Sequence, residues 1–199
     1  MWESTHPRAA PELLAGLTCP WWIAGGWALD LFMGRESRPH RDLDVGILRR
    51  DASRVVEALP DWEFFAARDG TLRRLDDRAP EPRVNSLWCR PQGAFRWVLE
   101  LLLDDCDGDA WVFRRRRDIR RPLAAAIRFD RTRIPYLAPE IQLLYKAQRP
   151  RPEDDADFRN VAPRLDEGGR SFLHDALAGI DPHHPWLEVL AAPRGKECA

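Results

Sequence analysis

Three carboxylates in two apolar segments are the residues of this sequence whose types and spacing could do chemistry. Asp42 and Asp44 stand one residue apart in DLDVGIL, which reads as a strand, and Glu100 interrupts the apolar run FRWVLELLLDD. Side chains alternate faces along a strand, so the two aspartates are predicted to point the same way, about 7 Å apart. A solvent-exposed strand end is the alternative for this pair, and a solvent-facing edge strand is the alternative for Glu100.

A divalent cation would explain why these acids stand together. Like charges repel each other when no cation lies between them, and a buried ionised Glu is costly without a partner. Mg²⁺ prefers carboxylate and phosphate oxygens. Asp104 lies on the same predicted face of its strand as Glu100 and is the alternative third acid.

A pair of glycines supplies a second element of a possible site. The bulky apolar segment 21–24 predicts a buried strand that stops at Gly25 and Gly26, and a helix is predicted from about Trp27 to Met33. Unpaired N–H groups and the positive dipole end at a helix N-terminus favour an anion such as phosphate. A tight turn without a ligand is the alternative for the glycine pair taken alone.

The elements that must position these residues fall into two parts. Up to about residue 135, turn residues separate segments with strand character, at 62–68, 71–75, 84–89, 95–103, 111–114 and 124–129. After that point the pattern predicts helices only. We therefore predict an α/β (α+β) fold, with a mixed β-sheet and flanking helices in a domain 1–135. A small C-terminal helical subdomain follows in 136–199.

Composition limits the class of protein. The chain has 199 residues, a net charge of −1, 44% hydrophobic residues and 32% charged residues, which is typical of a globular protein and not of a disordered one. The near-neutral charge argues against a general nucleic-acid coat protein. No apolar run reaches the roughly 20 residues of a membrane span. With no secretory signal and four scattered cysteines, we expect a cytoplasmic protein in a reducing compartment.

Two charge runs allow alternative interpretations. The basic run RRRRDIRR (114–121) could face nucleic acid, but it lacks interleaved aromatic residues, so a solvated hairpin is favoured. The acidic run DDCDGD (104–109) begins just after Glu100. It could attract a cationic amino sugar to a site there, or it could form a polar hairpin loop.

The stretch AGGWALDLFMGRESRPHRDLDV resembles the signature of the nucleotidyltransferase superfamily, which has the DNA polymerase β-like fold. That signature is an apolar residue, Gly-Gly or Gly-Ser, a helix, Asp-x-Asp on a strand, and a third acid on a later strand. The form GGWA…GR…R.H.D.D is most similar to aminoglycoside and lincosamide nucleotidyltransferases and their uncharacterised relatives. The resemblance is specific over residues 22–46 and looser over 97–104 and over PEIQLLYKAQRPRPEDDADF.

The resemblance implies roles for the acids and the glycines. Gly25 and Gly26 would contact a nucleoside triphosphate. Asp42 and Asp44 would bind one or two Mg²⁺ ions. Glu100 stands where many members have Asp, and it would be a third metal ligand or the general base.

Basic residues complete the site that the resemblance implies. Arg38 and Arg41, in the loop before the Asp-x-Asp strand, could clamp phosphate oxygens with their planar forks, or they could belong to a solvated loop. Lys146 matches a helix position where such enzymes often place a basic residue near the phosphates. Asp155 and Asp157 follow in a region that often carries acids beside the substrate.

The implied activity is that of an enzyme, a Mg²⁺-dependent nucleotidyltransferase. It would move a nucleoside monophosphate, AMP from ATP, to a hydroxyl of a small molecule such as an aminoglycoside- or lincosamide-like antibiotic. Its partners would be the nucleotide and this acceptor, with no membrane and no nucleic acid. The alternatives are a protein- or RNA-modifying minimal nucleotidyltransferase and a non-catalytic nucleotide-binding protein that keeps the fold.

Overall fold

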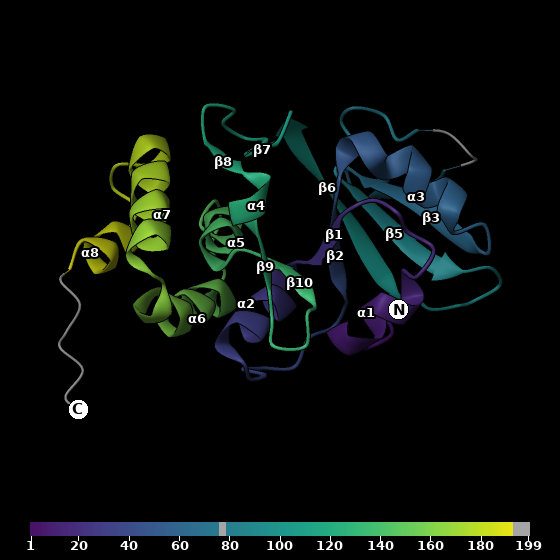
Figure 1. Ribbon diagram of the computed structural model, residues 1–199, viewed down its shortest axis with the longest axis horizontal. Helices are drawn as coiled ribbons and strands as arrows, with labels where there is room; N and C mark the ends of the chain where they lie inside the picture. Colours follow the sequence, from purple (N-terminus) through teal and green to yellow (C-terminus); the bar gives the residue numbers. More distant parts are fainter. Residues whose placement is uncertain (76–78, 193–199) are drawn as a thin grey trace. The chain divides into compact units, whose positions relative to one another are not determined.

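The computed structural model describes residues 1–75 and 79–192. The chain divides into two compact units, Met1–Leu137 and Ala138–Ala199. The first contains all the strands of the described chain, and the second consists of helices (Figure 1). Among the four cysteines of the sequence, Cys198 lies outside the described residues.

A mixed β-sheet forms the frame of the first unit. Its strands follow the order β4 (Thr71–Arg74), β3 (Trp62–Arg68), β5 (Ser86–Pro91), β6 (Leu99–Asp107), β2 (Asp44–Leu48), β1 (Trp21–Ile23), β10 (Pro135–Leu137) and β9 (Ile127–Phe129). β2 is parallel to β6 and β1 is parallel to β10, while the other neighbours are antiparallel. The short strands β7 (Ala110–Val112) and β8 (Arg120–Pro122) extend the end of β6. The predicted mixed sheet is confirmed.

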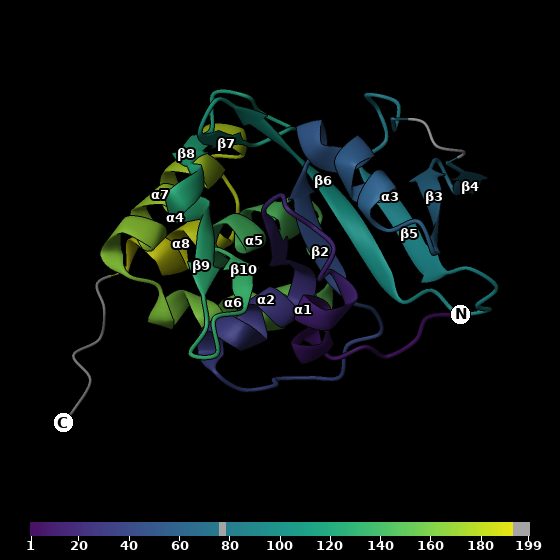
Figure 2. The same ribbon diagram turned by 45° about the vertical axis from the view of Figure 1, so that its right-hand side comes forward.

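The two faces of this sheet differ in burial. Along β2, β5 and β6 every second side chain is fully buried, and these residues are Val45, Ile47, Leu87, Cys89, Leu99, Leu101 and Leu103. Helix α3 (Ala52–Ala58) lies along the β3–β5–β6 part of the sheet (Figures 1 and 2). Among the alternate side chains Asp44 and Glu100 are half-buried, whereas Leu48 and Asp104, at the other end of β2 and β6, are buried. The polar residues are thus placed on the opposite face from the apolar core.

Three further helices complete the first unit. They are α1 (Ala10–Leu13), α2 (Gly25–Met33) and α4 (Leu123–Ala126). Helix α2 ends at Gly34, whose φ of 69° is a left-handed conformation that glycine adopts without strain.

Two of the predicted strands are wrong in part. The segment predicted as a strand at 124–129 begins as α4 and continues as β9, because its Leu-Ala-Ala-Ala start has high helix propensity. β6 begins at Leu99 and not at residue 95. The residues before it form a turn in which Trp97 pairs with Trp2 of the N-terminal segment.

The second unit is helical, as predicted. Its helices are α5 (Pro139–Lys146), α6 (Pro152–Val161), α7 (Glu167–Ile180) and α8 (Trp186–Ala191). Proline occupies the first position of α5 and α6, where its missing N–H costs no helical hydrogen bond. The Phe158 ring stacks on Trp186 with centroids 4.2 Å apart. Within the described residues, each helix is too short or too polar to cross a membrane.

The acidic run and the basic run form ion pairs with each other at the far end of β6. Arg117 pairs with Asp105 at 3.0 Å, and Arg120 pairs with Asp107 at 2.6 Å. Arg49 also pairs with Asp105, at 2.7 Å. The structure therefore agrees with the hairpin alternative for both runs.

Candidate active site

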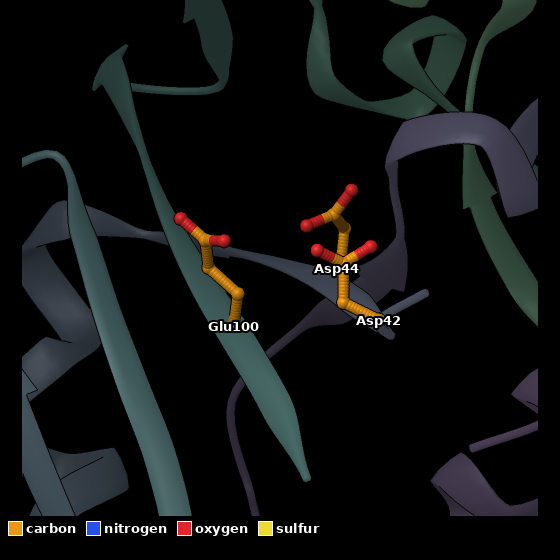
Figure 3. Close-up of side chains that lie close together, drawn as sticks. All are labelled: Asp42, Asp44 and Glu100. Carbon is orange, nitrogen blue, oxygen red and sulfur yellow. The ribbon is translucent and has the colours of Figure 1, made fainter. Parts of the chain in front are cut away.

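Asp42, Asp44 and Glu100 form one cluster of carboxylates. Each offers an oxygen atom, and the three oxygen atoms all lie within 4.8 Å of one another. All three side chains are half-buried, and their carboxyl groups project to the same side of β2 and β6 (Figure 3). This acid cluster is a set of hard oxygen ligands of the kind that Mg²⁺ and similar cations prefer.

Strand pairing brings the acid cluster together. Asp44 lies directly opposite Glu100 in the parallel β2–β6 pair, and the Glu100 N–H donates to the Leu43 carbonyl at 2.9 Å. Asp42 was predicted on the strand, but β2 begins at Asp44 and Asp42 lies in the bend before it. The two aspartates therefore reach the same point from a bend and a strand end.

The surroundings of Glu100 disfavour its ionised form in the absence of a cation. Burial raises the pKa of Glu100 above its ordinary value, and the nearby charge of Asp42 adds to that effect. Hydrogen bonds from the side chains of Ser86 and Trp88 act in the opposite direction. Burial outweighs these two hydrogen bonds, so the pKa of Glu100 stays raised when no cation is bound.

Asp104, the alternative third acid, lies elsewhere. It pairs with Leu48 at the other end of β2 and is buried. Four residues of β-strand separate it from Glu100, which corresponds to about 13 Å. The acid cluster of the described chain contains Glu100 and not Asp104.

The glycine pair begins helix α2 right beside the acid cluster. Gly25 has a φ of 64°, and a Cβ atom added there would lie 1.9 Å from the Asp44 Oδ2 atom. A Cβ atom on Gly26 would lie 2.4 Å from the His40 ring. The N-cap residue of α2 is Ala24, which makes no side-chain capping hydrogen bond. The positive end of this nine-residue helix is therefore adjacent to the carboxylates, as the sequence predicts.

A buried network centred on Asp30, a residue that the sequence reasoning missed, fastens the following loop to α2. His40 Nε2 lies 2.6 Å from Asp30 Oδ2, and the Ser37 hydroxyl donates to Asp30 Oδ1 at 2.5 Å. Burial alone would raise the pKa of Asp30, but the hydrogen bonds from His40 and Ser37 outweigh it and hold that pKa below its ordinary value. Asp30 stands four residues after Gly26, on the same helix face, and this spacing could have revealed it.

The predicted basic residues occupy different surroundings. Arg38 lies against the start of α2, because a Cβ on Gly26 would be 2.7 Å from its guanidinium. Arg41 is exposed on the loop before β2. Both positions are in the same segment as the acid cluster, and their contacts with phosphate stay predictions.

Lys146 lies at the end of α5 in the second unit, where it contacts two acids. Its ammonium group is 2.6 Å from Asp154 Oδ1 and 3.0 Å from Asp157 Oδ2. All three side chains are more than 90% buried. Arg151 adds a second positive charge on Asp154 at 3.0 Å. These ion pairs tie α5 to α6, and a phosphate contact for Lys146 stays a prediction.

We expect Asp154→Asn to lower the free energy of unfolding by about 2 kcal/mol at pH 7, because it leaves a buried ammonium with one acid. Burial would raise the pKa of Asp154, but hydrogen bonds from Arg151 and Lys146 lower it to about 2. Its contribution is therefore complete above the unfolded pKa of about 3.9. It is lost as the pH falls towards 2, so the difference between the two proteins should shrink there. Urea denaturation of both proteins at several pH values measures this difference in the free energy of unfolding.

The control for this change is Glu153→Gln in the same helix. Glu153 pairs with Arg151, and both side chains are exposed to solvent. Loss of this exposed ion pair should change the free energy of unfolding by less than about 0.5 kcal/mol. Equal effects of the two substitutions would contradict a structural role for the Lys146 ion pairs.

Comparisons with known proteins agree with this geometry. Residues 8–93 match the model of the aminoglycoside-2''-adenylyltransferase family, a range that includes the glycine pair and both aspartates. A lincosamide resistance protein of Staphylococcus haemolyticus is 30% identical over 50 residues, which are 25% of this chain and 31% of that protein. The chain thus spans about a third of this curated relative.

Two solved structures share the fold. The lincosamide antibiotic adenylyltransferase LnuA, in its lincomycin-bound crystal structure, matches with a TM-score of 0.52 and 17% identity over 77% of this chain and 92% of that one. The antibiotic-resistance factor ANT(2'')-Ia, in its solution structure, matches with a TM-score of 0.55 and 17% identity. The match covers 92% of this chain and 95% of that one. The predicted resemblance is confirmed: the chain has the nucleotidyltransferase fold and is similar to the aminoglycoside and lincosamide adenylyltransferases.

Proposed function

We propose that the chain is a Mg²⁺-dependent nucleotidyltransferase that moves AMP from ATP to a hydroxyl group of a small molecule, an antibiotic of the lincosamide or aminoglycoside kind. The observation that carries the proposal is the position of the acid cluster beside the N-terminus of α2. The family match over residues 8–93 supports the reaction class.

The ligands present fit Mg²⁺. Three carboxylate oxygens within 4.8 Å of one another form a set of oxygen donors only, and they come from Asp42, Asp44 and Glu100. When bound there, Mg²⁺ would supply positive charge to the phosphate oxygens of the nucleotide. Without a cation, burial and then the charge of Asp42 raise the pKa of Glu100.

The residues of the chain have separable tasks in this proposal. Gly25 and Gly26 allow phosphate oxygens to approach the backbone N–H groups of α2. Arg38 and Arg41 hold further phosphate oxygens by their guanidinium forks. The network of Asp30 with His40 keeps the loop that carries these arginines against α2.

The reaction exchanges one bond of the α-phosphorus for another. The acceptor hydroxyl oxygen forms a bond to the α-phosphorus, and the bond from that phosphorus to the bridging oxygen of pyrophosphate breaks. The hydroxyl proton passes to the carboxylate of Glu100, which lies in the acid cluster and accepts a hydrogen bond from Ser86. Pyrophosphate leaves towards the N-terminus of α2.

Release of pyrophosphate tests the proposal directly. The protein is incubated with Mg²⁺ and each of the four nucleoside triphosphates, against lincomycin, tobramycin and simple polyols. We expect release with ATP that needs both an acceptor and an intact Asp44. Release that continues unchanged in Asp44→Asn, or the absence of any Mg²⁺-dependent nucleotide binding, would contradict the proposal.

A further inference from the structure

An aromatic cluster lies on the sheet of the first unit and consists of Trp2, Phe65, Trp88 and Trp97. The Trp88 ring is 4.8 Å from Trp2 and 5.6 Å from Trp97, between centroids, and the Phe65 ring is 5.0 Å from Trp97. The Arg90 guanidinium lies 4.7 Å from the Trp97 centroid. All of these side chains are half-buried, so each keeps exposed surface.

Strand register places the aromatic cluster on the same face as Glu100. Trp88 of β5 lies directly opposite Glu100 of β6, and Phe65 of β3 lies opposite Trp88. Paired residues of neighbouring strands project from one face. The Trp88 side chain also hydrogen-bonds to Glu100. The aromatic cluster therefore begins at the carboxylate that we propose as the proton acceptor.

The order of the strands separates two sides of the acid cluster. Helix α2, with its glycine pair, follows β1 on one side, and the aromatic cluster lies on β5 and β3 on the other side. In an in-line displacement, the attacking oxygen and the leaving oxygen lie on opposite sides of the phosphorus. If the pyrophosphate lies at α2, the acceptor arrives from the side of the aromatic cluster.

On β3, β4 and β5 the charges of this face are positive in balance, and Glu100 of β6 borders it. Among the described residues of β3, β4 and β5 that share this face, Glu63 is the acid. It is paired with Arg90 at 2.8 Å and with Arg74 at 3.2 Å. A molecule with several ammonium groups would meet two guanidinium groups here and an acid that is already neutralised. Exposed ring faces instead suit an apolar face of a neutral molecule.

Resting on the proposed function, we infer that the aromatic cluster is the acceptor subsite. It takes a hydroxyl compound that has an apolar ring face and at most one positive charge, in preference to a polycationic amino sugar. The geometry that carries this inference is the continuity of Trp88 with Glu100 on the side of the acid cluster away from α2.

Steady-state kinetics of Trp97→Ala test the subsite. Trp97 belongs neither to the acid cluster nor to α2. Its loss should raise the KM for lincomycin about tenfold, the effect of one lost ring contact. The KM for ATP should stay unchanged. Phe95→Ala is the matched control, because Phe95 is 95% exposed and lies two residues away outside the cluster. Trp2→Ala repeats the test if Trp97→Ala does not fold.

The outcomes that overturn the inference are specific. A rise in the KM for ATP alone would mean that the rings hold the nucleobase. A lower KM for tobramycin than for lincomycin, unchanged by Trp97→Ala, would contradict the charge argument.

A second readout separates this inference from the proposed function. Lincomycin should quench tryptophan fluorescence without nucleotide, with about tenfold weaker affinity in Trp97→Ala. If this holds while no acceptor gives pyrophosphate release, the transferase proposal fails and the binding surface stands. If Trp97→Ala and Trp2→Ala both release pyrophosphate with wild-type kinetics, the subsite inference is wrong and the transferase proposal stands.

Discussion

Asp44→Asn is expected to lower kcat/KM for pyrophosphate release by about 10³-fold or more, since a lost metal ligand should cost at least as much as a lost oxyanion donor. Asp44 lies at the centre of the acid cluster, opposite Glu100 and against Gly25. The substitution keeps the shape of the side chain and removes one charge. Titration with Mn²⁺ should show the loss of a divalent site.

Thermal unfolding distinguishes this loss from misfolding. Mg²⁺ binds the native state, so it should raise the melting temperature of the wild-type protein and not that of Asp44→Asn. Without Mg²⁺ the variant should be at least as stable as wild type, because one of three neighbouring like charges is gone. Asp61→Asn, at an exposed acid of the same unit, should behave as wild type in both assays. Equal loss of activity in Asp61→Asn would contradict a local role for Asp44.

The candidate acids could be predicted from the sequence, but which of them assemble into the acid cluster could not. Alternation along a strand explains why Glu100 is half-buried among buried leucines. The parallel register of β2 with β6 joins residues 56 positions apart in the chain. No local pattern specifies that register. This is why Asp104 was an equal candidate on alternation alone and lies opposite Leu48 in the structure.

The partners of the site residues were also beyond local patterns. Ser86 and Trp88 meet Glu100 only because β5 lies beside β6. The acidic and basic runs each look like an interaction surface when read alone. Part of their charge is paired once β6, β7 and β8 form a meander that sets Arg117 against Asp105 and Arg120 against Asp107. Charge patterns along a chain predict a surface potential only when the fold keeps the opposite charges apart.

Gly25→Ala is the second substitution with a large expected effect, and it tests the contact between the glycine turn and the acid cluster. Alanine at a φ of 64° costs about 1 kcal/mol of folding free energy. Its Cβ would also lie 1.9 Å from Asp44 Oδ2, so the carboxylate must move. A displacement of about 1 Å in a catalytic group can lower the rate about 10²-fold. Pyrophosphate release and urea denaturation measure the two effects separately.

Gly34→Ala provides the matched control at the other end of the same helix. Gly34 has a φ of 69°, and a Cβ there meets no atom within 4 Å. The backbone cost of the two substitutions should therefore be similar, while only Gly25→Ala should lose activity and divalent binding. If both variants keep full activity, Gly25 is needed only for the backbone conformation of the turn and has no role in the active site. If both lose activity equally, the loss comes from strain in α2, and the contact of Gly25 with Asp44 has no separate role.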